Sequence, residues 1–333
     1  MRLPPLRHLQ IPFLGALCLL AIALSLGWGA PVSLSDLWSS DPARAHAAQQ
    51  IFLQIRPPRT LAALLVGASL AVAGAGLQTM FGNPLAEPYL LGISAGGALG
   101  ATLAVAFGLP AIGAFDAGAF LAFGGALAAA GTVYALGQTR DQSAATGDRA
   151  RLLLVGVALS ALLAALMSLV VALSGRLDLA QQISFWLLGG FGRSSWPQNV
   201  FLALALAVGM AILLGSARDL NALRAGDEDA AALGVEVAAL HRRILIAASL
   251  LAAASVAAAG LIGFIGLLAP HIVRLLGARD LRVLLPASAL GGAALLCVCD
   301  ALARGLFAPI EIPVGIVTAL LGVPLFLSVA RRM

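Results

Sequence analysis

Arginine supplies all of the positive charge of this chain, and its planar guanidinium group binds carboxylates through paired hydrogen bonds. The 333 residues include 20 basic residues, and none of them is lysine. Two arginines enclose a proline pair in Arg56-Pro57-Pro58-Arg59, and Arg304 follows Asp300 by four residues. Three interpretations stay open: exposed charges that steer a partner, anchors at the lipid interface and, for Arg304, a helical pair with Asp300.

A second pair of arginines brackets a short segment with adjacent aromatic residues. Arg176 and Arg193 lie on either side of Phe185-Trp186. Because arginine binds carboxylates well, these two residues are candidates for a substrate path that receives a carboxylate-bearing compound. The alternative is that they anchor helix ends beside an aromatic belt at the membrane interface.

Residues suited to covalent or metal chemistry are sparse. Cys18, Cys297 and Cys299 lie in apolar segments without metal-ligand or redox spacing, which predicts buried thiols. His271 has no companion ligand, so it fits a helix end better than an iron site. Without lysine the chain cannot form the phosphate-binding loop of an ATPase. We therefore expect a protein that is not an enzyme and that holds no metal and no cofactor of its own.

The elements that must position these residues are membrane helices. Hydrophobic residues make up 61% of the chain and charged residues 11%, whereas a soluble domain carries about 25% charge. A bilayer-spanning helix needs about 20 apolar residues. The sequence predicts an all-α, polytopic membrane protein that forms a single transmembrane domain over 1–333. The expected spans lie at about 11–30, 60–81, 89–108, 114–138, 151–174, 192–214, 244–259, 260–277, 282–303 and 311–330.

Two of these expectations need a further argument. The first run follows two arginines but is too long for a signal peptide, so we expect it to be retained as a span. The run over 244–277 is too long for one span, and we expect Gly260, Gly263, Gly266 and Pro270 to supply its break.

The distribution of arginine predicts the orientation of the chain. Ten spans place both termini on one side, and that side holds fourteen arginines against six on the other. The positive-inside rule then places both termini in the cytoplasm. The longest cytoplasmic loop, 216–243, is also the most charged.

A polar segment with two prolines interrupts the apolar sequence after the second run. Pro84 and Pro88 prevent a regular helix there, and irregular backbone at membrane depth is tolerated mainly beside a cavity. A tight turn between two helices is the alternative. Further on, Gly92, Gly96 and Gly100 form a stripe that favours close helix packing over substrate contact.

The spans contain few ionisable side chains, which limits the ways in which a transporter could be powered. None occurs in 88–115, 117–139, 152–175, 194–217, 283–299 or 312–330. A proton-coupled carrier requires titratable groups within the membrane. The remaining classes are a passive channel, a sodium-coupled carrier that uses backbone carbonyls, and a pore subunit driven by a separate ATPase. A weak similarity between 59–77 and 243–261, which face opposite sides, also predicts an inverted repeat.

Five ordered motifs resemble those of a known family, the FecCD-type permease subunits of binding-protein-dependent ABC importers for vitamin B12, ferric siderophores and haem. They are RPPR at 56–59, NPLAEPYLLGISAG at 83–96, LNALRAGDEDAAALGV at 220–235, GLIGFIGLLAPHIVRLLG at 260–277, and the run from Asp300-Ala301-Leu302-Ala303-Arg304 to Glu311-Ile312-Pro313-Val314-Gly315. The resemblance implies a vitamin-B12-permease-like fold of ten helices in the bacterial inner membrane. It also implies a homodimer with the path at its interface, two cytoplasmic ATPase subunits that use ATP and magnesium, and a periplasmic binding protein.

The resemblance further implies roles for residues at matching positions. The residues expected to dock the binding protein are Arg56, Arg59 and Arg304. The residues expected at a cytoplasmic gate are Asn83 and Leu85. The residues expected in a coupling segment, two short helices around a glycine turn within the cytoplasmic loop 216–243, are Asp227, Glu228, Asp229 and Gly234. The polar loop 137–151 has no counterpart that we can match, so we assign no gate residue to it.

The expected function is therefore that of a pore subunit that moves haem, a ferric siderophore or cobalamin from periplasm to cytoplasm. Haem is favoured because its two propionates suit Arg176 and Arg193, whereas cobalamin carries no propionate. The expected partners are a second copy of the chain, the ATPase subunits, the binding protein and the lipid bilayer, without nucleic acid. A self-sufficient ion-coupled carrier is the alternative.

Overall fold

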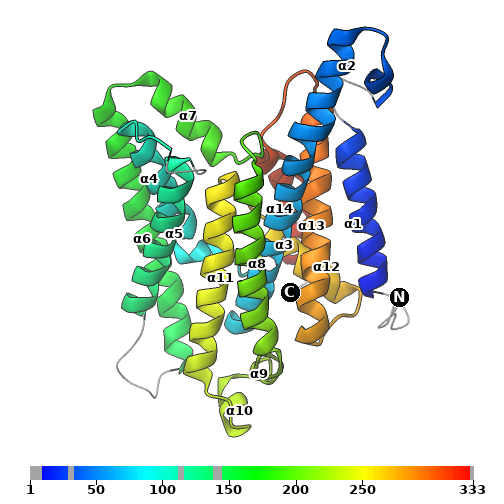
Figure 1. Ribbon diagram of the computed structural model, residues 1–333. Coiled ribbons are helices and arrows are strands. Elements are labelled where there is room, and N and C mark those ends of the chain that lie inside the picture. The colour runs from blue at the N-terminus through cyan, green and yellow to red at the C-terminus, as the bar shows by residue number, and fades with distance from the viewer. Residues whose placement is uncertain (1–9, 29–33, 112–115, 138–144, 331–333) are drawn as a thin grey trace.

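The computed structural model describes residues 10–28, 34–111, 116–137 and 145–330 (Figure 1). The described residues form helices joined by short connections, and no strand occurs among them. Seven of the helices are long and apolar enough to cross a membrane, and three shorter apolar helices accompany them.

Each of the ten predicted spans corresponds to one helix, which confirms the all-α polytopic fold. The ten helices are α1 (Gln10–Gly27), α3 (Arg56–Phe81), α4 (Ile93–Ala106), α5 (Ala117–Gly137), α6 (Ala145–Ser174), α8 (Trp196–Gly215), α11 (Val237–Ala259), α12 (Ile265–Leu275), α13 (Leu281–Gly305) and α14 (Val314–Ala330). The short ones are α4, α12 and α14.

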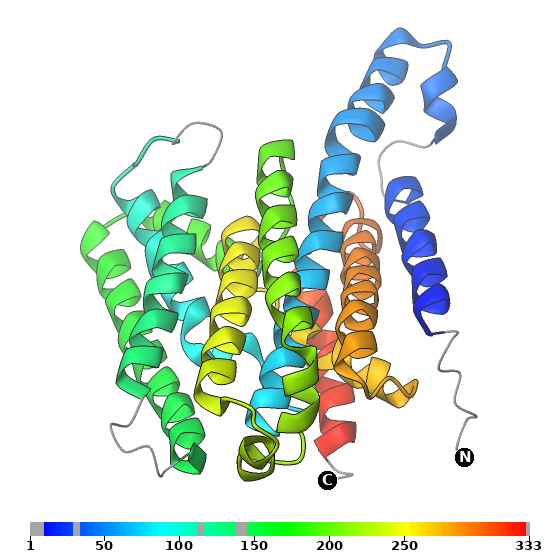
Figure 2. The same ribbon diagram turned by 60° about the horizontal axis from the view of Figure 1, so that its bottom comes forward.

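Short helices mark the two ends of the molecule. At one end lie α9 (Ala217–Leu223) and α10 (Asp227–Ala232), together with the start of α1 and the end of α14 (Figures 1 and 2). At the opposite end lies α7 (Leu177–Leu187). We refer to these as the α10 end and the α7 end.

The helix that contains the proline pair starts earlier than the sequence predicts. α2 (Pro42–Gln49), a π-helical turn η2 (Gln50–Ile55) and α3 form one continuous helix of 40 residues, where the sequence predicted a span at about 60–81. The Asp41 side chain caps it by accepting a hydrogen bond from the Ala43 amide. The π turn widens the backbone just before Pro57 and Pro58, where the proline rings would otherwise clash with the preceding turn.

The break in the run over 244–277 is shorter than predicted. Gly260, with φ 68°, ends α11, and α12 begins five residues later, so Gly266 and Pro270 lie inside a helix. Pro270 has no amide hydrogen to donate to the Gly266 carbonyl one turn earlier. The Gln78 side-chain amide donates to that carbonyl instead, at 3.1 Å. This replacement from α3 explains how α12 tolerates an internal proline.

Close helix crossings at glycine hold the centre together. A methyl group added at Gly67 of α3 would overlap the Gly292 carbonyl of α13, and one at Gly74 would overlap the Gly266 carbonyl of α12. Gly96 lies equally close to α5, which confirms packing as the role of this part of the glycine stripe. Gly92 does not belong to the stripe, because it lies before α4 with φ 74°.

Candidate functional site

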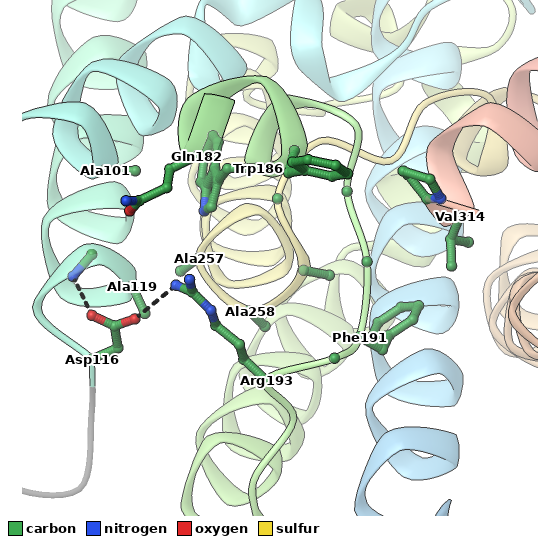
Figure 3. A pocket seen from close by; sticks show the side chains of 18 of the residues that line it. Ala101, Asp116, Ala119, Gln182, Trp186, Phe191, Arg193, Ala257, Ala258 and Val314 are labelled. Carbon is green, nitrogen blue, oxygen red and sulfur yellow. Dashed lines mark hydrogen bonds and ion pairs between the residues drawn. The ribbon is translucent and has the colours of Figure 1, made fainter. Parts of the chain in front are cut away.

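A cavity of about 590 Å³ opens at the α7 end. Gln182 and Trp186 from α7 lie on one side of it, and Asp116 and Arg193 lie on another (Figure 3). Arg59 and the loop before α14 also line it. The cavity therefore has both apolar walls and several charged groups, as ligand and partner sites commonly do.

The two arginines that we expected along a substrate path are both paired with carboxylates. Arg193 Nη1 lies 3.3 Å from Asp116 Oδ2 at the cavity, with 78% of the Arg193 side chain exposed. Arg176 Nη2 lies 2.6 Å from Asp178 Oδ2, and Arg176 does not line the cavity. The hydrogen bond from Arg176 holds the pKa of Asp178 below its usual range. Of these two arginines, the structure thus brings only Arg193 to the cavity.

A buried ion network lies beneath the cavity. Asp300 on α13 is fully buried, and it accepts hydrogen bonds from Arg59 at 3.0 to 3.2 Å and from Arg304 at 3.1 Å. Arg59 Nη1 also lies 2.9 Å from Glu311 Oε2, and the Glu311 side chain is 56% exposed. Arg304 donates further bonds to Ser25. This confirms the Arg304–Asp300 pair, whereas Arg59 as its second partner was not visible in the sequence.

The three arginines expected to dock a partner are not exposed, so that premise of the prediction is wrong. Arg56 is 3% exposed, and Arg59 and Arg304 are each 7% exposed. Arg56 donates to the Leu26 carbonyl at 2.7 Å and lies over the Phe52 ring. Arg59 and Arg304 are buried because the Asp300 carboxylate, which lies in an apolar core, requires charged partners. Arg56 is buried because the helix continues before it, back to Pro42. Docking by these residues stays a prediction.

The polar segment between α3 and α4 contacts the break between α11 and α12. Asn83 is exposed and accepts a hydrogen bond from the Leu85 amide at 2.8 Å. Glu87 accepts one from the Phe264 amide at 2.6 Å, and the Tyr89 hydroxyl donates to the Ile262 carbonyl at 3.1 Å. Side chains of the segment between α3 and α4 thus satisfy backbone groups exposed by the break between α11 and α12. No role was predicted for Glu87, which directly precedes the range 88–115 without ionisable side chains.

A short helical hairpin occupies the α10 end. Gly226 separates α9 from α10 with φ 127° and ψ 164°, a conformation open to glycine alone. Gly234, with φ 85°, follows α10 and turns the chain toward α11. Gly226 therefore forms the turn between the two short helices, and Gly234 forms a second turn at the end of α10, where its coupling role stays a prediction.

The residues of this hairpin face in different directions. Asp227 is buried and lies 3.6 Å from His241 on α11, whereas Glu228 and Asp229 are exposed. Leu233 is 73% exposed. Asn221 attaches α9 to the start of α13. Its side-chain amide donates to Asp280 at 2.8 Å, and its side-chain oxygen accepts a hydrogen bond from the Leu281 amide at 3.1 Å. The hairpin thus exposes apolar and acidic side chains, while hydrogen bonds attach α9 to the start of α13.

The sequence profile of the FecCD transport family matches residues 16–332. The chain belongs to the FecCD transport family. It is an ABC importer permease of that family, which agrees with the fold and with the helical hairpin at its α10 end.

Individual relatives of the FecCD permease differ in what they are named to transport. The present chain is 42% identical to the hemin transport system permease protein HmuU of Yersinia pestis, over 96% of this chain and 95% of the relative. It is 43% identical to the cobalamin import system permease protein BtuC of Halobacterium salinarum, over 93% and 79% of the two chains. These similarities are too alike to separate the two substrates.

A solved structure has the same fold as the FecCD permease. It is an ABC transporter assigned to the metal-chelate type, in an inward-facing conformation. The TM-score is 0.83 at 33% identity, covering 97% of this chain and 99% of that one.

The remaining predicted residues of the permease have simple structural environments. Cys18, Cys297 and Cys299 are free and buried, as predicted. His271 is half-buried near the α10 end, and no group of metal-ligating side chains surrounds it within the described ranges. Residues 138–144 of the loop 137–151 lie outside the described residues, and α6 already begins at Ala145.

Proposed function

We propose that the chain forms one half of a homodimeric pore that two ATPase subunits drive with ATP and magnesium. The observation that supports this most directly is the α9–α10 hairpin. Its exposed Leu233, next to the exposed acidic residues Glu228 and Asp229, is suited to a groove on a motor subunit. In this proposal the α10 end faces the cytoplasm of a bacterial inner membrane, as the excess of arginine at that end favours.

The α7 end would then receive a periplasmic binding protein. Buried arginines cannot meet a partner unless a more exposed group moves, and Glu311 is the exposed member of the ion network. We propose that acidic side chains of the binding protein approach the cavity beside Arg59 and compete with Glu311 for it. Arg56 and Arg304 hold the surrounding helix ends in place through their bonds to Leu26 and Ser25.

For the cargo we propose haem, with a ferric siderophore or cobalamin as the alternatives. The support is Arg193 at the cavity. Both side chains of the Arg193–Asp116 pair are exposed, and exposed ion pairs contribute about 1 kcal/mol or less to stability. Arg193 is therefore available to a propionate at little cost, whereas Arg176 lies outside the cavity. We further propose that Asn83 and Leu85, joined by a hydrogen bond at 2.8 Å, form a gate at the cytoplasmic mouth.

The experiment that tests the function is uptake into vesicles that contain the chain with or without its ATPase subunits. Internal ATP should support uptake of haem after ionophores have collapsed the proton and sodium gradients. Uptake by the chain alone, driven by an ion gradient, would establish the alternative of a self-sufficient carrier. Binding spectra of the partner binding protein with haem and cobalamin then separate the cargoes.

A further inference from the structure

Four arginines gather at the α10 end around the turn between α12 and α13, and we call them the arginine cluster: Arg224, Arg274, Arg279 and Arg282. Arg224 donates to the Arg279 carbonyl at 2.9 Å, which joins the end of α9 to the turn. Arg274 donates to the Gln78 side chain. Among the described residues, no carboxylate lies within ion-pair distance of these four guanidinium groups.

The acid nearest to the cluster does not neutralise it. Asp280 accepts hydrogen bonds from the Arg282 amide at 2.9 Å and from Asn221 at 2.8 Å, so it caps α13 and fixes α9. The bond from the Arg282 amide, followed by that from Asn221, holds the pKa of Asp280 below its usual range. One carboxylate among four arginines leaves a net positive charge that calls for an anion from outside the chain.

Apolar surface lies directly beside this charge. Leu275, at the end of α12, is 72% exposed, and Ile272 one turn earlier is also exposed. The adjoining helix is α1, because Gln10 donates to the Leu276 carbonyl at 2.6 Å. α1 exposes Phe13 near the same end. Figure 2 shows the turn between α12 and α13 on the side of the molecule that α1 occupies.

We propose that the arginine cluster binds the phosphate headgroup of an anionic phospholipid, whose acyl chains lie along α12 and the start of α1. Cations beside an exposed apolar strip complement a lipid, which carries both a phosphate and hydrocarbon chains. A water-exposed groove of an ATPase would match the arginines but not the membrane-facing strip. Because Arg224 follows α9, the bound headgroup lies against the base of the helical hairpin.

The test measures lipid retention by the purified full chain in neutral detergent, using native mass spectrometry and titration with phosphatidylglycerol. The test variant is Arg279→Gln with Arg282→Gln. The matched control is Arg151→Gln with Arg242→Gln, which removes the same charge from exposed positions at the starts of α6 and α11. Phosphatidylcholine and inorganic phosphate serve as further probes, and Arg282→Gln alone is used if the double variant does not fold.

The proposal expects one phosphatidylglycerol molecule held by the unmodified chain and by the control. Binding should be about 25-fold weaker in the test variant, since each of the two arginines near a membrane surface contributes about fivefold. Equal retention by all three chains would overturn it. So would phosphate alone displacing the lipid, or loss of ATPase-subunit association in the test variant with lipid retention unchanged.

Discussion

At the scale of single residues, Arg59 connects a buried charge to the surface. The Nε and Nη2 groups of its guanidinium donate to the fully buried Asp300, and Nη1 donates to the exposed Glu311. Removing one partner of a buried pair is costly because the other charge stays behind without full compensation. Arg304 remains beside Asp300 and limits that cost.

We expect Arg59→Ala to lower the free energy of unfolding by about 3 kcal/mol, the lower end of the range for breaking a buried pair. Denaturant unfolding in detergent measures it. The control is Arg176→Ala, which breaks an exposed pair and should lower the free energy of unfolding far less than Arg59→Ala does. Equal costs for the two variants would show that the network does not stabilise the fold.

Gly234 gives a second prediction at this scale. Its φ of 85° disfavours any side chain, although a methyl group there would meet no neighbouring atom. Gly234→Val should therefore strain the hairpin by about 1–3 kcal/mol and uncouple ATP hydrolysis from uptake, without dispersing the dimer. Gly215→Val is the control, because Gly215 is equally open but has no positive φ. Normal ATPase activity and normal uptake in Gly234→Val would rule out a coupling role for this turn.

At the scale of elements, the positions of the helices could be predicted from the sequence, but their exact limits could not. Apolar runs located all ten helices because a bilayer imposes length and composition on each one. The continuation of α3 back to Pro42 was missed because a π turn accommodates the prolines. The helical state of Pro270 was missed because the compensating donor, Gln78, lies 192 residues earlier in the chain, and such pairings leave no local pattern.

This compensation can be tested with a double-mutant cycle. Gln78→Leu should cost about 1–3 kcal/mol, because it leaves the Gly266 carbonyl without its donor and Arg274 without its acceptor. Pro270→Ala restores an amide that can donate to the same carbonyl. In that background the cost of Gln78→Leu should fall by about 1 kcal/mol, measured by thermal or denaturant unfolding. Additive effects would mean that Gln78 does not replace the missing proline bond.

At the scale of the whole molecule, charge is arranged differently at the two ends. At the α7 end Arg59, Arg176, Arg193 and Arg304 pair with acids, whereas the α10 end keeps the arginine cluster without ion pairs among the described residues. The sequence predicted the side on which arginines concentrate but not which of them are buried. Burial depends on pairs such as Arg59 and Asp300, which lie 241 residues apart. The gate and docking assignments stay predictions, since a single chain contains no partner.

The pairing at the α7 end predicts how the binding protein should respond to a change in charge. Glu311→Gln removes the exposed competitor for Arg59 while Asp300 keeps the arginine in place. Association with the binding protein should become faster and more sensitive to salt, as for other rim charges. Stopped-flow measurements at several salt concentrations test this, with Asp178→Asn as the control at another exposed pair. Unchanged or slower association would contradict the competition.

The continuous helix from Pro42 to Phe81 has a mechanical consequence. At about 1.5 Å per residue its 40 residues extend about 60 Å, twice the thickness of the hydrocarbon layer. A rod of that length acts as a lever. Its crossings at Gly67 and Gly74 lie about 40 Å from the Pro42 end, so a tilt of about 10° at these crossings would carry that end about 7 Å sideways.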